Sequence, residues 1–176
     1  MTRMKLHTLS LSLILIAAPA WSHGKEKHDA AVVAGRDDSR AEQQIAPAAA
    51  DAVAVVERFS AALAAGDVDK AAAELDPAVL ILESGGVERS RDEYLLAGHA
   101  RADAAFLKEA QVSPRRRTAQ ASGELAWVGS ESAIHAKKGE TVLAIDSTET
   151  MVLRKTAQGW KIVHIHWSSR RAGGDH

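Results

Sequence analysis

Cysteine is absent from the sequence, which excludes disulfide bonds, thiolate metal sites, cysteine nucleophiles and a lipid-modified N-terminal cysteine. The chain also has no large excess of positive or negative charge, because 22 lysine and arginine residues are balanced by 23 aspartate and glutamate residues. Without an excess of positive charge, binding to nucleic acid or to an anionic membrane is not expected. The motifs of a phosphate-binding loop, a nucleophile elbow and a zinc protease are missing as well.

The first 22 residues carry the pattern of a secretory signal peptide. Arg3 and Lys5 supply positive charge, an apolar run follows over residues 9–18, and small residues come next, among them Ala20 and Ser22. The run is shorter than the roughly 20 apolar residues that a membrane span requires. We therefore expect cleavage after Ala20 or Ser22, a periplasmic or secreted protein, and no membrane association after the signal is removed.

The remaining chain divides into a lead segment, one domain and a short tail. Residues 23–50 are rich in alanine and charge and show no sustained apolar stripe, which predicts a flexible segment. Apolar residues recur at helical spacing from residue 51, and Gly66 marks the end of this first helix. Asp67 is placed to cap a second, short helix. We predict a domain over residues 51–170 and a tail over 171–176.

The order of elements in this domain predicts an α+β fold. A short strand over residues 79–82 ends at the glycine pair Gly85-Gly86, and Ser90 with Glu93 forms a capping box that opens a third helix. Four strands follow, over residues 115–121, 124–136, 141–155 and 160–168. Three helices packed against a curved antiparallel sheet would form a cone with a pocket.

The last two strands resemble a known superfamily. The segments Glu149–Lys155, Ala157–Gly159 and Trp160–Ser169 are similar to the closing strands of the nuclear transport factor 2-like superfamily, nearest to its SnoaL-like branch and to the association domain of calmodulin-dependent kinase II. The resemblance covers Asp51 to Arg170 and implies a cystatin-like α+β roll that dimerises through the outer face of its sheet. Known members include ketosteroid isomerases, polyketide cyclases, dehydratases, ligand-binding proteins and oligomerisation domains, so the fold alone does not define the activity.

Glu83 is the first candidate catalytic residue. The resemblance implies that a carboxylate near this position removes a proton next to a carbonyl group, and an apolar cone would raise its pKa toward the range of a useful base. The isomerases also place a tyrosine from the first helix at the oxyanion, whereas this helix offers only Phe59 and Ser60. The single tyrosine, Tyr94, lies on the third helix. The alternative is a solvated carboxylate beside a turn.

His164 and His166 are the second candidate set, with His164 as an alternative base. Strand alternation places both rings on one face, together with Trp160 and Ile162, and Trp167 on the other face. The two imidazoles would either line the cone or lie in a dimer interface. They could contact a ligand carbonyl or bind a metal ion, or they could simply hydrogen-bond carboxylates on the neighbouring strand.

Trp127 and His135 share one face of the strand over residues 124–136. A flat apolar ring and a polar tip are typical of a pocket lining, although His135 could equally lie at an exposed strand end. The expected ligand contacts are Tyr94, Trp127, His135, His164 and His166.

These observations favour an exported homodimeric domain that binds a small, mostly apolar ligand, without a cofactor or a metal ion. One alternative is an enzyme on the same scaffold, an isomerase, cyclase or dehydratase that uses Glu83 or a histidine as its base. Others are an oligomerisation module and a periplasmic copper-binding protein, in which His23, as the new N-terminus, and His28 would supply the ligands.

Overall fold

The computed structural model describes residues 41–138 and 141–173. The predicted signal peptide, the residues His23 and His28, and the lead segment up to residue 40 lie outside the described residues, so export stays a prediction. None of the helices in the described ranges is long and apolar enough to cross a bilayer.

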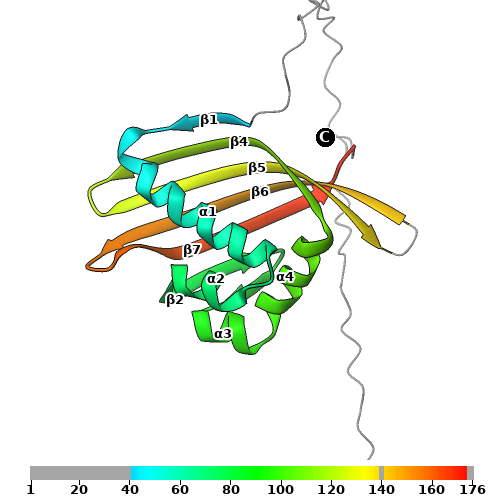
Figure 1. The fold of residues 1–176 in the computed structure, drawn as a ribbon, viewed down its shortest axis with the longest axis horizontal. Helices are drawn as coiled ribbons and strands as arrows, with labels where there is room; N and C mark the ends of the chain where they lie inside the picture. Colours follow the sequence, from blue (N-terminus) through cyan, green and yellow to red (C-terminus); the bar gives the residue numbers. More distant parts are fainter. Residues whose placement is uncertain (1–40, 139–140, 174–176) are drawn as a thin grey trace, which may run out of the picture. The chain divides into compact units, whose positions relative to one another are not determined.

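Four α-helices, one 3-10 helix and seven strands make up the described residues. In chain order they are β1 (Glu42–Ile45), η1 (Pro47–Ala49), α1 (Ala50–Ala64), α2 (Val68–Glu74), β2 (Leu75–Glu83), β3 (Gly86–Glu88), α3 (Arg91–Leu96), α4 (His99–Glu109), β4 (Gln111–Ser122), β5 (Leu125–Lys138), β6 (Thr141–Thr156) and β7 (Gly159–Arg171). Figure 1 shows this order by colour and label.

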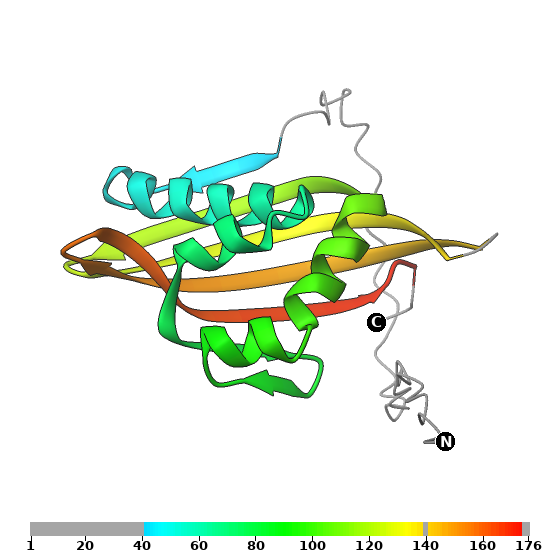
Figure 2. The same ribbon diagram turned by 60° about the horizontal axis from the view of Figure 1, so that its bottom comes forward.

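The strands form one sheet in the order β1-β4-β5-β6-β7-β2-β3. The predicted meander of four antiparallel strands is confirmed as β4 to β7. The sheet as a whole is mixed, because β1 runs parallel to β4 and β2 runs parallel to β7. Figures 1 and 2 show the helices lying across one face of this bent sheet. The α+β fold class is confirmed.

Two predicted boundaries are wrong. Residues 42–45 belong to the sheet rather than to a flexible lead segment, because β1 pairs with β4 from Glu42 to Ile45. The third helix is two helices, α3 and α4, because Gly98 adopts a left-handed conformation with φ of 85° and interrupts the helical hydrogen bonding. The predicted caps are present: Ser90 Oγ accepts from the Glu93 amide at 3.0 Å, and Asp67 accepts from the Lys70 amide at 3.1 Å.

The core lies between α1 and the concave, helix-facing side of the sheet. Val128, Met151, Ile165 and Ile81 occupy matching positions on four neighbouring strands, and each is fully buried. Phe59 of α1 packs over this row at 1% exposure. Burial of each such side chain contributes about 1.5–3 kcal/mol, so this row fixes which face of each strand points toward the helices.

A bulge in β7 changes the faces predicted for that strand. His164 pairs with Val152, but Ile162 pairs with Leu153, so Val163 is an additional residue in β7. As a result Ile162 and Ile165 are both fully buried. The prediction that Ile162 and Trp160 share the face of the two histidines is therefore wrong, because simple alternation fails across the bulge.

Candidate functional site

A row of polar and aromatic side chains crosses the helix-facing side of the sheet. On the neighbouring strands β4, β5, β6, β7 and β2, each member of this row is the Cα partner of the next. The members are Arg117, Ser130, Glu149, Trp167 and Glu83. Adjacent strands lie roughly 4.8 Å apart, so Trp167 has a carboxylate on each of its two neighbouring strands. The row extends the concave face beyond the apolar core.

The β2–β3 hairpin brings a second carboxylate to the end of this row. Ser84 and Gly85 form its two-residue turn with φ values of 44° and 89°, and Glu83 pairs with Gly86. Two residues along β3, Glu88 pairs with the buried Ile81. Strand alternation therefore places Glu83 and Glu88 on the same, helix-facing side of the hairpin.

Helix α4 supplies the facing groups. His99 and Asp103 are four residues apart and therefore lie on one side of the helix. His99 Nδ1 contacts Glu88 Oε1, and Tyr94 of α3 donates its hydroxyl proton to Asp103 Oδ2 at 2.8 Å. We refer to Glu83, Glu88, Tyr94, His99 and Asp103 as the hairpin–helix cluster.

The environment shifts the pKa values in this cluster upward. Partial burial raises the pKa of Glu83, although the residue as a whole remains exposed at the end of β2, and the charges of Asp103 and Glu88 add to the effect. Burial also raises the pKa of Asp103, against the hydrogen bond from Tyr94, and it is the main reason that the Tyr94 pKa is raised. The hydrogen bond to Glu88 raises the pKa of His99. Carboxyl groups whose pKa values are raised are better suited than ordinary ones to accept and release protons toward neutral pH.

Trp167 connects this cluster to the buried carboxylate of Glu149 and its polar neighbours Arg117 and Ser130. Its ring stacks on Phe59 with centroids 6.4 Å apart, and the Tyr94 ring lies tilted at the same distance. Its Nε1 donates to Glu149 Oε2 at 2.8 Å. Burial raises the pKa of Glu149, although Trp167, Arg117 and Ser130 all favour its charged form. The indole is held from several sides and forms a rigid wall beside Glu83.

The structure joins Glu83 and Tyr94 but separates them from the other predicted site residues. A second row lies on the convex side of the sheet, where each residue is the Cα partner of the next across β5, β6, β7 and β2. Its members are Trp127, Val152, His164 and Leu80. The placement follows from alternation relative to the buried core row.

The remaining imidazoles lie on the same convex side. His166 follows His164 by two residues and so shares its strand face. His135 lies on the same face of β5 as Trp127, because the pairing of β5 with β6 is uninterrupted between them. His164 Nδ1 lies 2.9 Å from the carbonyl oxygen of Leu80 rather than near a carboxylate. The imidazoles predicted as ligand contacts therefore do not join Glu83 in the cone.

Glu88, His99 and Asp103 are cluster members that the sequence analysis did not identify. Glu88 has a local signal, because a two-residue turn at Ser84-Gly85 places it on the same face as Glu83. His99 and Asp103 show the i, i+4 spacing of one helix face. Their proximity to the hairpin has no local signal, since it depends on how α4 packs.

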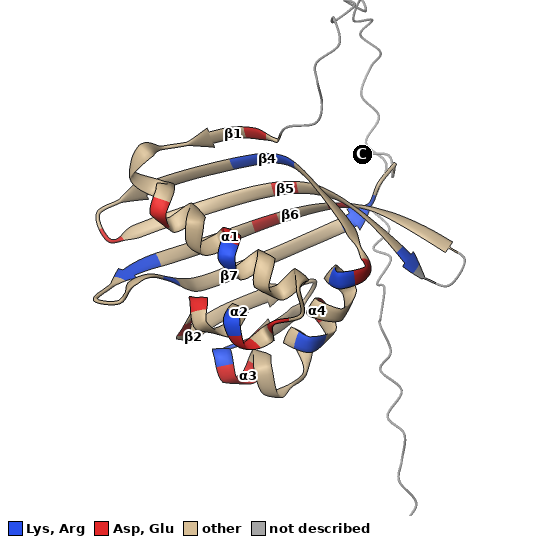
Figure 3. Ribbon diagram, in the orientation of Figure 1, with Lys and Arg blue, Asp and Glu red and all other residues tan. Residues whose placement is uncertain are grey.

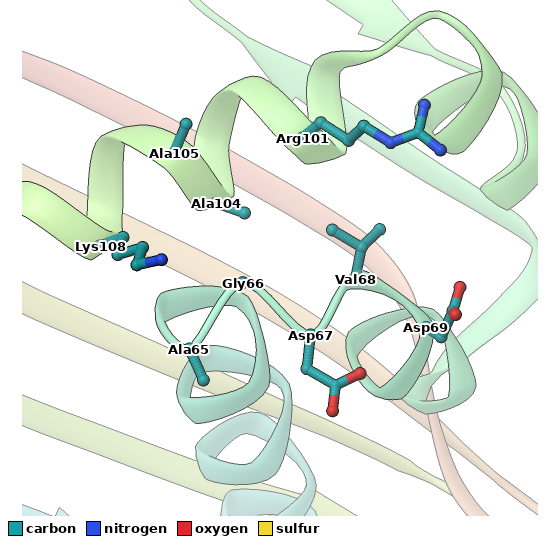
Figure 4. A pocket seen from close by; sticks show the side chains of 9 residues that line it. All are labelled: Ala65, Gly66, Asp67, Val68, Asp69, Arg101, Ala104, Ala105 and Lys108. Carbon is teal, nitrogen blue, oxygen red and sulfur yellow. The ribbon is translucent and has the colours of Figure 1, made fainter.

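Two hollows in the described residues lie apart from the cluster. One of about 640 Å³ separates the α1–α2 junction from α4, and Figure 4 shows Arg101 and Lys108 on one side and Asp67 on the other. A second of about 280 Å³ is lined by polar residues near Asp146. Neither includes a cluster residue.

Charge is mixed across the domain. Figure 3 shows lysine and arginine interspersed with aspartate and glutamate on helices and strands. Residues 41–138 and 141–173 contain no set of three or more His, Asp or Glu side chains arranged to hold a metal ion.

Known proteins share this fold. A family model described as a SnoaL-like domain matches residues 52–171. A candidate ketosteroid isomerase from Shewanella frigidimarina is 35% identical with a TM-score of 0.66, over 70% of this chain and 99% of that chain. The S. rosetta CaMKII hub is 23% identical with a TM-score of 0.61, over 71% of this chain and 98% of that one.

A further solved structure describes the fold itself. An NTF2-like protein with a cystatin-like fold from Novosphingobium aromaticivorans is 14% identical with a TM-score of 0.57, over 72% of this chain and 82% of that one. No curated protein matches the chain. The family match over residues 52–171 and the 35% identity show that the chain belongs to the SnoaL-like family of the nuclear transport factor 2-like superfamily.

Proposed function

We propose that the protein is a proton-transfer enzyme of the isomerase or dehydratase type, acting on a small, mostly apolar carbonyl compound. The observation that carries the proposal is the hairpin–helix cluster, in which two carboxyl groups with raised pKa values, a histidine and a tyrosine meet beside the aromatic wall of Trp167. A pure binding site needs no such convergence of ionisable groups. The similar candidate isomerase from Shewanella frigidimarina supports the same reaction class.

Glu83 is the base in this proposal. Its carboxylate takes a proton from the carbon next to the carbonyl, and the electron pair of the broken C–H bond moves to the carbonyl oxygen as an enolate forms. In an isomerisation the protonated Glu83 then returns the proton to another carbon of the substrate. In a dehydration it gives the proton to the β-hydroxyl group, which leaves as water while the enolate collapses to the carbonyl and a C=C bond forms. The raised pKa of Glu83 makes its carboxylate a stronger base than an ordinary glutamate.

Asp103 supplies the hydrogen-bond donor for the enolate oxygen. The first helix lacks the tyrosine expected there, but burial raises the pKa of Asp103, so its carboxyl retains a proton to higher pH than an ordinary aspartate. Tyr94 donates to one oxygen of Asp103 and fixes its orientation, leaving the other oxygen for the substrate.

The test measures proton transfer directly. The purified protein is incubated in D₂O with a panel of small β,γ-unsaturated ketones and hydroxy-ketones, and NMR follows deuterium uptake and product formation. Glu83→Gln should lower kcat by about 10²–10⁴-fold, the usual loss for a general base, without any loss of thermal stability. Glu124→Gln, at the exposed β4–β5 turn, is the matched control.

Full turnover by Glu83→Gln would remove Glu83 from the mechanism. Ligand binding without exchange by the wild-type protein would replace the enzyme with the ligand-binding module favoured by the sequence.

We also propose that two copies associate through the convex side of the sheet. Leu80, Trp127 and Leu125 lie on this side and are 38%, 39% and 55% exposed. An apolar strand face related to itself by a two-fold axis is self-complementary, and one copy would cover the exposed rings of the other.

A further inference from the structure

His99 lies at the centre of the hairpin–helix cluster. It is the first residue of α4 and follows the left-handed Gly98. Its side chain is 55% exposed, while that of its partner Glu88 is only 7% exposed. The contact therefore joins a solvent-accessible imidazole to a buried carboxylate and fixes the start of α4 against β3.

Carboxylates from three elements face this imidazole. Glu88 of β3 contacts it, Glu83 lies on the same side of the hairpin, and Asp103 follows one turn later on α4. Tyr94 of α3 contacts the group through Asp103. Each carboxylate disfavours ionisation of the others, and the imidazolium opposes this repulsion.

Nearby arginines are directed elsewhere. Arg89 Nη1 lies 3.9 Å from Glu93 Oε1, and Arg91 Nε lies 3.6 Å from Asp92 Oδ1. The positive charge that faces Glu83 and Asp103 is that of His99.

Resting on the proposed function, we propose that His99 is a positioning residue: its imidazolium, anchored by Glu88, favours the carboxylate form of Glu83 and holds Asp103 beside it. The direction of the charge effects agrees with this role. Burial is the main influence and raises the pKa of Glu83 and of Asp103, while the smaller effect of the His99 charge lowers both. When pH rises through the raised pKa of His99, this opposing effect is lost.

The experiment titrates the side chains of the full chain by NMR, without any substrate. Carboxyl ¹³C shifts follow Glu83 and Asp103, and imidazole shifts follow His99. His99→Gln should move the titration midpoint of Glu83 to higher pH by about one unit, the lower end of the usual effect of a neighbouring opposite charge. Glu88→Gln should move the midpoint of His99 to lower pH.

Two further variants separate charge from structure. His99→Lys retains a positive charge and should keep the Glu83 midpoint near its wild-type value. Arg101→Gln removes a positive charge from the exposed side of the same helix and should leave the midpoint unchanged. An unchanged Glu83 midpoint in His99→Gln would overturn the inference, as would a shift of equal size in Arg101→Gln.

Turnover provides an independent second readout. In His99→Gln the acidic limb of the kcat/KM profile should move to higher pH, while kcat at the plateau changes less. A loss of kcat at all pH values with no shift of the limb would mean a structural role for His99 and would contradict the inference. If the wild-type protein shows no turnover, the proposed reaction fails, but the titrations still decide the role of His99.

Discussion

Glu149 is a buried carboxylate that is hydrogen-bonded and yet energetically unfavourable in its charged form. Its Oε2 accepts from Trp167 Nε1 at 2.8 Å, and Ser130 and Arg117 also favour its charged form. Arg117 is shared, because its Nη1 donates to Glu57 Oε1 of α1 at 2.9 Å. Burial nevertheless has the larger effect, so the charged form is less favoured in the folded than in the unfolded chain.

Glu149→Gln should therefore stabilise the protein in a pH-dependent way. The folded-state pKa is raised above the ordinary value of 4.5, so the folded chain binds more protons than the unfolded chain above that pH. The stability contribution of Glu149 is fully present at lower pH and is lost as pH rises through the folded-state pKa. Glutamine is always neutral and retains an oxygen that accepts from Trp167.

Urea unfolding, followed by tryptophan fluorescence from pH 4 to pH 8, tests this. The free energy of unfolding of Glu149→Gln relative to wild type should increase with pH. Glu131→Gln, an exposed carboxylate on β5, should show no such trend. A constant difference, or one that falls with pH, would mean that Arg117 and Trp167 outweigh burial.

Gly98 determines where the hairpin–helix cluster is assembled. It separates α3, which carries Tyr94, from α4, which carries His99 and Asp103, and its φ of 85° is unfavourable for any residue with a Cβ atom. A continuous helix would carry Asp103 away from Tyr94 on a straight axis. The break therefore positions the hydrogen bond between these two side chains.

Gly98→Ala should destabilise the fold by about 1–2 kcal/mol, the usual cost of a left-handed non-glycine residue. The added Cβ meets no neighbouring atom within 4 Å, so the effect is one of backbone conformation alone. Gly129→Ala is the control, because Gly129 lies in β5 with an allowed φ and its Cβ would make an ordinary 3.6 Å contact with Trp127. Urea unfolding measures both, and equal stabilities would contradict the prediction.

Elements with a local signal could be predicted from the sequence. The caps at Asp67 and Ser90 and the four long strands depend on neighbouring residues, and the structure contains them. Strand β1 was missed because Glu42 to Ile45 shows no alternation and forms only by pairing with β4. The bulge at Val163 was missed for the same reason, since register depends on the partner strand.

The candidate site was predictable only in part, because it is a property of the whole molecule. Glu83 and Tyr94 were identified from the resemblance and from the rarity of tyrosine, and they lie within one cluster. Asp103 could not be paired with Tyr94 from the sequence, because the contact depends on the turn at Gly98. The sequence left open whether His164 and Trp127 line the cone, because only the buried core row defines which strand face is concave.

The placement of Trp127 and His164 leads to a prediction about assembly. Both lie on the convex side, in a row that continues through Val152 to Leu80. If two copies meet there, as we propose, a carboxylate in this row would be buried without a partner in the dimer but solvated in the monomer. Trp127→Glu should therefore shift the protein from dimer to monomer and leave its fold intact.

Native mass spectrometry and light scattering at micromolar concentration measure the subunit count, and circular dichroism checks the fold. Leu96→Glu is the matched control, because Leu96 is 86% exposed on α3, a helix that packs against β2 and α4 rather than on the convex side. It should leave a dimer unchanged. A monomeric wild-type protein, or a Trp127→Glu variant that remains dimeric, would show that the convex side is not the interface. Because the hairpin–helix cluster lies on the opposite side of the sheet, a folded Trp127→Glu monomer should retain the Glu83 titration midpoint of the wild-type protein.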